Sequence, residues 1–185
     1  MGGRAARPIF LSCALLLLAT SSAAAEVYLT KEQALAVALP QGCTPRYDPK
    51  DLSSELIERL EDARLMGEEQ KQAHFFVCED GAKPRGYALI DSEIGKHLPI
   101  TYVVGISAEG RVTRVEMMVF REVRGWEARE QKFLHQFEGK GSSDKFKLGT
   151  EIENVTGATI SAASMTKGVK RALLLWQEFY GNKGS

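Results

Sequence analysis

The sequence predicts an α+β protein in which a twisted antiparallel sheet is packed by helices, forming a single domain after a signal peptide. Three observations support this prediction. Segments rich in β-branched and aromatic residues are joined by short turns in the middle of the chain, and apolar residues recur at helical spacings on either side. Residues 1–25 have the pattern of an export signal. Short turns join antiparallel strands, and helices with one apolar face pack onto such a sheet.

The first 25 residues are expected to be removed as a secretory signal peptide. Arg4 and Arg7 form a basic start, an apolar run extends from Ile9 to Ala19, and Ala23-Ala24-Ala25 offers a cleavage site. This run has only 11 residues, whereas a membrane-spanning helix needs about 20. We therefore favour cleavage over an uncleaved membrane anchor.

Cleavage would leave 185 − 25 = 160 residues, enough for one domain with its own core. The 24 basic residues would fall to 22 against 24 acidic ones, for a net charge of −2. This near-neutral chain has no basic run, so nucleic acid is not an expected partner. Cys43 and Cys78 would remain. An oxidising compartment permits a disulfide between them, and two buried free thiols stay equally open.

Two helices are expected before the sheet. A capping-box pattern, Thr30 with Gln33, opens the first helix from Lys31 to Leu39. A loop of residues 41–50 leads to a second helix, which we expect to end at Gly67. Its apolar residues recur at spacings of four and three, and they are Leu52, Leu56, Leu60 and Ala63.

Four strands are expected next, because their residues favour extended backbone and turn signals separate them. They are Ala73 to Cys78, Arg85 to Ile90, Pro99 to Ile106 and Arg111 to Arg121. Trp126 to Phe137 then reads as a helix, and a last helix is expected from Ser161 to Tyr180. Gly168 interrupts the last helix at a cost of about 1 kcal/mol against alanine, which indicates a close backbone approach.

No catalytic constellation stands out. The three histidines, His74, His97 and His135, lack metal-ligand spacing. No nucleophile-elbow pattern is present either. We therefore name no catalytic and no metal-binding residue.

A different kind of site is indicated at the start of the last helix. Thr156-Gly157-Ala158-Thr159 combines two small residues with two hydroxyl residues just before an expected helix start. Unpaired backbone N–H groups and a partial positive charge at such a start favour an anion such as phosphate. These four residues alone fit helix capping better, because Thr and Gly are common caps.

The stretch from Glu153 to Thr166 resembles the flavinylation segment of the FMN-binding domain family. That family includes the C and G subunits of the sodium-translocating NADH:quinone reductase and the Rnf complex, and many small exported proteins. The matching residues are Glu153, Thr156, Gly157, Ala158 and Thr159. The resemblance implies that Thr159 carries FMN through a phosphoester bond, which a separate flavin transferase makes from FAD. Glu153 stands where the family most often has Asp.

Further motifs upstream extend this resemblance over about residues 85–180. Residues 95–106 resemble the first core strand of the family, 119–127 its Glu-x-x-Gly turn, and 133–140 its aromatic-Gln-Phe-x-Gly-Lys run. We accordingly divide the chain into a signal peptide (1–25), an N-terminal helical cap region (26–80) and an FMN-binding domain (81–182).

The FMN phosphate is expected at the helix start near Ser161 and at the backbone around Gly157. A pocket for the flavin ring is expected at the turn after the last strand. There Trp126 is either a ring wall or a core aromatic, and Arg124 either a surface residue or a group that stabilises reduced flavin. The expected cofactor-binding residues are Glu122, Arg124, Gly125, Trp126, Glu153, Thr156, Gly157, Ala158, Thr159 and Ser161.

The expected function is that of an exported flavoprotein that transfers electrons, rather than a stand-alone enzyme. The expected location is the periplasm, with membrane association left open. The expected partners are a flavin transferase and a membrane redox complex or other electron-transfer protein. Two alternatives remain: a non-redox module that binds FMN or another phosphate ligand non-covalently, and a secreted reductase.

Overall fold

The computed structural model describes residues 25–66 and 70–181. The expected signal peptide and the expected helix end at Gly67 therefore lie outside the described residues. Within the described ranges, no helix has both the length and the apolar character that crossing a membrane requires.

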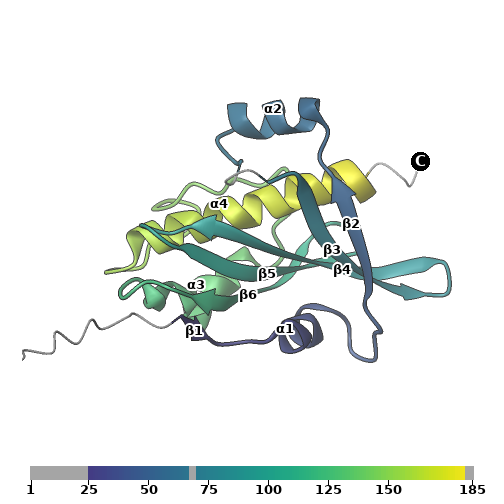
Figure 1. The fold of residues 1–185 in the computed structure, drawn as a ribbon, viewed down its shortest axis with the longest axis horizontal. Coiled ribbons are helices and arrows are strands. Elements are labelled where there is room, and N and C mark those ends of the chain that lie inside the picture. The colour runs from purple at the N-terminus through teal and green to yellow at the C-terminus, as the bar shows by residue number, and fades with distance from the viewer. Residues whose placement is uncertain (1–24, 67–69, 182–185) are drawn as a thin grey trace, which may run out of the picture.

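Six antiparallel strands form one open sheet in the order β1-β6-β5-β4-β3-β2, which confirms the predicted α+β class (Figure 1). The four expected strands are confirmed with shifted ends. The strands are β1 (Glu26–Val27), β2 (Arg46–Asp51), β3 (Gln72–Asp80), β4 (Lys83–Ile94), β5 (Pro99–Ser107) and β6 (Val112–Phe120). The short turns between β3, β4, β5 and β6 give the antiparallel pairing.

The prediction of a loop over residues 41–50 is wrong for residues 46–50, which belong to β2. The sequence of β2 is polar and contains Pro49, which is typical of a turn rather than a strand. β2 pairs only with β3, from Arg46 opposite Val77 to Asp51 opposite Gln72, at the edge of the sheet. Proline is tolerated in edge strands, so pairing to β3 overrides the local propensity.

Residues 26–80, expected as a helical cap region, contain both expected helices and also strands β1, β2 and β3. Helix α1 spans Lys31–Ala38 and begins with the predicted capping box, and α2 spans Ser54–Asp62. The expected boundary after residue 80 falls inside the β3–β4 hairpin, where Asp80 pairs with Lys83. The proposed domain limits themselves stay a prediction.

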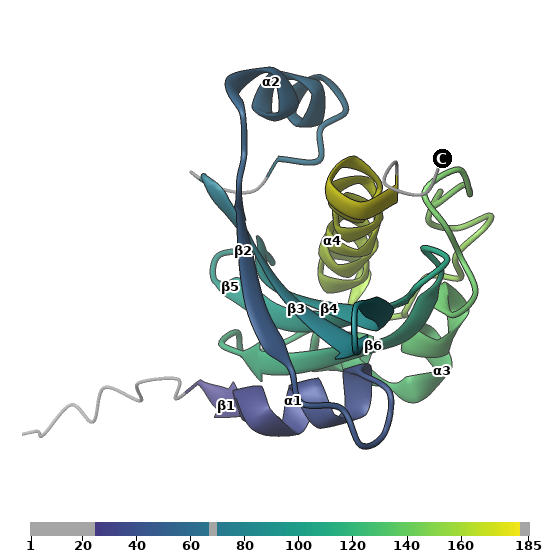
Figure 2. The same cartoon turned by 90° about the vertical axis from the view of Figure 1, so that its right-hand side faces the viewer.

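The sheet separates two hydrophobic cores. The long helix α4 (Thr159–Trp176) lies along one face of the sheet, and α1 covers the other face (Figure 2). The larger core joins α4 to the sheet and includes Phe75, Tyr102, Phe120, Met165 and Leu173. The smaller core lies under α1 and includes Leu35, Phe76 and Val103. A disulfide joins Cys43 to Cys78, which settles that alternative.

The single helix predicted over residues 126–137 is wrong. The segment forms three short pieces: η1 (Trp126–Arg129), α3 (Gln131–Leu134) and η2 (His135–Phe137). The extended backbone of Glu130 interrupts the helical run. Phe133 and Phe137 are buried, whereas Trp126 is 45% exposed and does not belong to the core.

Candidate functional site

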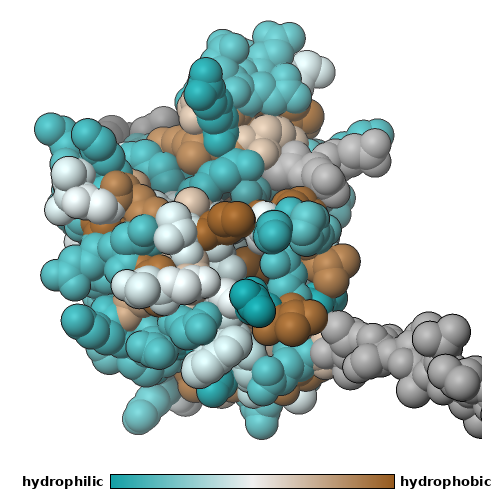
Figure 3. All heavy atoms as spheres, turned by 90° about the vertical axis from the view of Figure 1, so that its left-hand side faces the viewer, coloured by the Kyte–Doolittle hydropathy of each residue, from teal (hydrophilic) through white to brown (hydrophobic). Residues whose placement is uncertain are grey.

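Three segments meet around the N-terminal end of α4 and enclose a pocket of about 330 Å³. They are the β4–β5 turn, the loop after β6 and the residues that begin α4. Seven of the predicted residues line this pocket: Glu122, Arg124, Gly125, Gly157, Ala158, Thr159 and Ser161. Figure 3 looks onto this end of the molecule, where apolar patches alternate with polar ones. Residues 122–125 and 157–161 are far apart in the chain, and the fold brings them together.

The first turn of α4 offers free backbone donors to the pocket. Helix α4 begins at Thr159, two residues before the expected start, and no side chain caps it. The first intrahelical bond runs from the N–H of Ala162 to the carbonyl oxygen of Ala158, over 2.8 Å. The N–H groups of Thr159, Ile160 and Ser161 therefore have no partner within the helix. A cap formed by a Thr hydroxyl, the simpler explanation of the motif, is not observed.

Thr159 is an exposed residue that lines the pocket, and its hydroxyl group accepts a hydrogen bond without donating its own hydrogen. Its Oγ1 accepts a hydrogen bond from Nδ2 of Asn154 over 3.1 Å. Oδ1 of Asn154 in turn accepts from the N–H of Val155 over 2.9 Å. Because Asn154 uses its amide as the donor, the Thr159 O–H stays available for another group.

Two glycines allow the backbone to pass close to the pocket. Gly125 has φ +99°, and a Cβ there would lie well within 3.0 Å of Oγ of Ser161. Gly157 has φ +85°, and its one close neighbour would be a carboxylate oxygen of Glu127, 3.7 Å from an added Cβ. Side chains other than glycine rarely adopt this left-handed backbone. The contact between Gly125 and Ser161 joins the loop after β6 to the first turn of α4.

The carboxylate of Glu122 binds the backbone of the β4–β5 turn and holds this turn in place. Its Oε1 accepts from the backbone N–H groups of His97 and Leu98 over 2.6 and 3.0 Å. Partial burial raises the pKa of the Glu122 carboxyl, but the N–H groups of Leu98, His97 and Lys96 outweigh it and hold the pKa below its usual value. The carboxylate is thus already engaged, and the turn brings Lys96 to the pocket.

Lys96 was not among the residues expected at the site, although it lines the pocket together with Arg124. In the sequence it stands in a turn between two strands, where a lysine carries no distinguishing signal. The pocket therefore combines two cationic side chains, a helix N-terminus and two hydroxyl groups. This set of donors suits an anion with several oxygen atoms.

Three of the predicted residues lie outside the pocket lining. Thr156 is exposed. The side chain of Glu153 is 76% exposed, with its nearest cation, Nζ of Lys132, at 3.9 Å. The backbone of Glu153 exchanges two hydrogen bonds with the side-chain amide of Gln136, which fixes this segment to η2. Trp126 follows the pocket residue Gly125 directly in the chain and is half-exposed.

No group of three or more metal-ligating side chains occurs within residues 25–66 and 70–181.

Comparison with known proteins agrees with the site. A search of curated proteins found no match. The sequence model of a protein family described as the FMN-binding domain matches residues 95–174, which include both the β4–β5 turn and the start of α4. Residues 95–174 thus match the FMN-binding domain family, and FMN is the cofactor that this family implies.

Proposed function

We propose that this protein is an exported carrier of FMN, attached through a phosphoester to Thr159, and that it transfers electrons in the periplasm. The observation that carries the proposal is the position of Thr159. Thr159 is the first residue of an uncapped helix, is exposed, and lines a pocket that two cationic side chains also line. The family match supports FMN as the ligand.

The residues around the pocket fit the phosphate group of FMN. The free N–H groups at the start of α4 and the hydroxyl of Ser161 would donate to phosphate oxygens. Lys96 and Arg124 would balance its negative charge. The carboxylate of Glu122 also lines the pocket, but backbone N–H groups engage its Oε1, which reduces its repulsion of an anion.

The pocket is small for a ligand pocket. Its volume of about 330 Å³ lies at the low end of the roughly 300–1,000 Å³ that is usual for ligand pockets. Exposed apolar side chains belong to the three segments that form it, and they are Leu98, Val123, Trp126 and Ile160. We place the flavin ring on this apolar rim, which keeps its edge accessible to an electron-transfer partner. Bound FMN supplies the redox chemistry, and the protein supplies position and charge.

The exposure of Thr159 suits modification by a second protein. A flavin transferase would use FAD as the donor. The bond between Oγ1 of Thr159 and the phosphorus of the FMN half would form, the pyrophosphate linkage of FAD would break, AMP would leave and the hydroxyl proton would pass to solvent. The Asn154 amide donates to Oγ1 and thereby orients the Thr159 hydroxyl, whose own hydrogen stays free to leave. Lys96 and Arg124 would stabilise the charge on the phosphate during the transfer.

Export is supported by two features. The first 25 residues have the pattern of a signal peptide. The Cys43–Cys78 disulfide is typical of proteins in an oxidising compartment. In such a compartment a covalent bond would prevent the loss of a dissociated cofactor. A membrane redox complex is the proposed partner.

Co-expression with a flavin transferase tests the proposal. We expect flavin fluorescence that survives denaturing electrophoresis, and an intact mass increased by one FMN less water. Thr159→Val should abolish both, whereas Thr150→Val, at an exposed threonine outside the pocket lining, should retain both. Persistent fluorescence in Thr159→Val would refute the attachment site. FMN that binds but never becomes covalent would favour the non-covalent module, and steady turnover of a donor and an acceptor would favour the reductase.

A further inference from the structure

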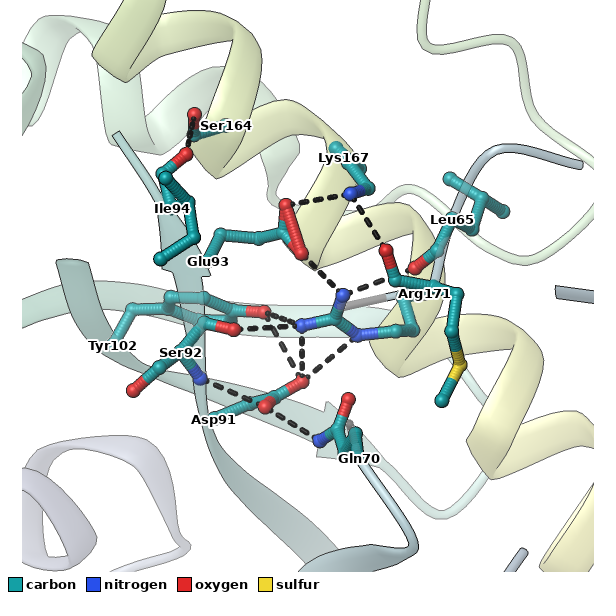
Figure 4. Close-up of polar contacts among 11 residues, drawn as sticks. Leu65, Gln70, Asp91, Ser92, Glu93, Ile94, Tyr102, Ser164, Lys167 and Arg171 are labelled. Carbon is teal, nitrogen blue, oxygen red and sulfur yellow. Dashed lines mark hydrogen bonds and ion pairs between the residues drawn. The ribbon is translucent and has the colours of Figure 1, made fainter. Parts of the chain in front are cut away.

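A buried polar network that the proposed cofactor site does not use lies between α4 and β4 (Figure 4). Arg171 is fully buried. It donates from Nε and Nη2 to Oδ2 of Asp91 over 3.0 and 2.7 Å, and from Nη1 to Oε1 of Glu93 over 2.5 Å. Nζ of Lys167 lies 2.9 Å from Oε2 of Glu93. Two cations and two carboxylates thus balance one another, three of them buried and Lys167 partly exposed.

The polar contacts between α4 and β4 form a ladder, a series of successive contacts that extends toward the pocket. Arg171 meets Asp91 and Glu93, Lys167 meets Glu93, and one helical turn further Oγ of Ser164 donates to the carbonyl oxygen of Ile94 over 2.6 Å. Residue numbers fall along α4 as they rise along β4. The ladder therefore points to the turn just after β4, where Lys96 and the start of α4 both line the pocket.

The other contacts of α4 with the sheet are mostly apolar and lack direction. Residues such as Ala162, Met165, Val169 and Ala172 are fully buried, but apolar burial alone does not fix which turn of the helix meets which strand residue. The planar guanidinium of Arg171 does fix this register, because its N–H donors point in fixed directions. Tyr102 adds to this restraint, since its Oη accepts from Nη2 of Arg171 over 3.1 Å.

Buried ion pairs add little net stability compared with well-packed apolar residues, and their best-attested use is to specify register. A slip of α4 by one turn would move it by about 5.4 Å. Such a slip would carry Thr159 out of the pocket and would separate Ser161 from Gly125. The register of α4 on β4 therefore decides whether the pocket exists.

We propose that Asp91, Glu93, Ser164, Lys167 and Arg171 are positioning residues that set the register of α4 and thereby hold Thr159 against Lys96 and Arg124. None of the five lines the pocket. They act through the helix, whose 12-residue separation between Thr159 and Arg171 corresponds to a rigid span of about 18 Å. The consequence for flavin attachment rests on the function proposed above for Thr159.

Two variants and one control test this role. The triple variant Asp91→Asn, Glu93→Gln, Arg171→Met removes the ion pairs without leaving an unpaired carboxylate or guanidinium in the core. Ser164→Ala removes only the contact nearest the pocket. Arg59→Met is the control, because it breaks an exposed ion pair of 3.0 Å with Glu178, just beyond the far end of α4.

Two measurements apply to each variant. The first is amide hydrogen exchange over residues 162–168 in the protein without flavin. The second is the initial rate of flavin attachment with transferase and FAD. We expect both variants to speed exchange there by about tenfold while the strands stay protected. We expect attachment to slow by about a hundredfold in the triple variant, the usual cost of misplacing reacting groups by about 1 Å. The control should match the wild type in both measurements.

Wild-type exchange and wild-type attachment in folded variants would overturn the proposal. So would an attachment rate that falls only in proportion to the unfolded fraction. Should the triple variant fail to fold, Ser164→Ala decides the question by the same two measurements. A wild-type protein that accepts no flavin would refute the proposed function, while the exchange measurement would still decide the register.

Discussion

Replacing Gly168 by alanine tests whether tertiary packing, rather than helix propensity, decides what α4 tolerates. In a free helix this change is favourable by about 1 kcal/mol, because glycine has the greater backbone entropy to lose. In this fold an added Cβ would lie 2.9 Å from Cε1 of Tyr102, and closer still to its Cζ and Oη. The expected sign is therefore reversed.

The size of the effect follows from how little Tyr102 can move. It is fully buried, and its Oη contacts both Asp91 and Arg171, over 3.2 and 3.1 Å. Forcing an extra methyl group into such a site costs about 1–3 kcal/mol, occasionally more. Because Tyr102 is held by both partners, we take the upper part of this range, about 2–3 kcal/mol. After subtraction of the propensity gain of about 1 kcal/mol, we expect Gly168→Ala to lower the free energy of unfolding by about 1–2 kcal/mol. For a domain of this size that corresponds to a fall in Tm of about 2–8 °C.

Urea unfolding followed by circular dichroism measures this difference, with the slope m as a check on two-state behaviour. The matched background is Tyr102→Leu, which removes the ring that an added Cβ would meet. In that background Gly168→Ala should be nearly neutral or stabilising. The double variant should therefore be more stable than the sum of the two single effects predicts. A Gly168→Ala variant as stable as the wild type, or more stable, would refute the close approach.

Three further predictions concern the disulfide, the β4–β5 turn and the pocket. Cys43→Ala with Cys78→Ala opens a loop with a separation of 35 residues and should lower the free energy of unfolding by about 3–4 kcal/mol, measured by urea unfolding against the oxidised wild type; an unchanged midpoint contradicts it. The folded pKa of Glu122 lies below its ordinary value of 4.5, so its stabilisation is present above pH 4.5 and is lost as the pH falls through the folded pKa. The stability difference between the wild type and Glu122→Gln should therefore shrink on acidification below pH 4.5, and a constant difference from pH 7 to pH 3 excludes this role. Gly125→Ala forces a side chain into left-handed backbone and against Ser161; it should cost about 1–3 kcal/mol and reduce FMN binding measured by fluorescence, and binding equal to the wild type disproves the contact.

Much of the fold could be predicted from local patterns. The capping box at Thr30 and Gln33 acts within one helical turn, so the sequence alone placed the start of α1. Strands β5 and β6 were also predicted from local sequence, because their β-branched residues favour extended backbone. The prediction failed where pairing with a distant segment decides the structure. Strand β2 is such a case, because its polar residues form a strand only when they pair with β3.

The site divides in a similar way. The order Thr156-Gly157-Ala158-Thr159 before a helix is compatible with an anion site, because helix N-termini offer free N–H groups. These four residues alone fit helix capping better, and the resemblance of the surrounding segments to a known family favoured the anion site. The role of Lys96 could not be predicted, since a lysine in a turn becomes a pocket residue only when the turn faces α4. Trp126 is not a core aromatic of one helix over residues 126–137, because the extended backbone of Glu130 interrupts that helix.

The sequence by itself thus determined the start of α4 within two residues and the capping box of α1, because each depends on near neighbours in the chain. It also predicted the α+β class from its strand and helix patterns, whereas the FMN-binding segment followed from its resemblance to a known family. Only the tertiary structure decided that Glu122 clamps a turn, that Lys96 joins Arg124 at the pocket, and that Arg171 holds α4 to Asp91 and Glu93, 80 and 78 residues away. These contacts depend on how the strands pair and how the helix packs on them. No local pattern of residues encodes that arrangement.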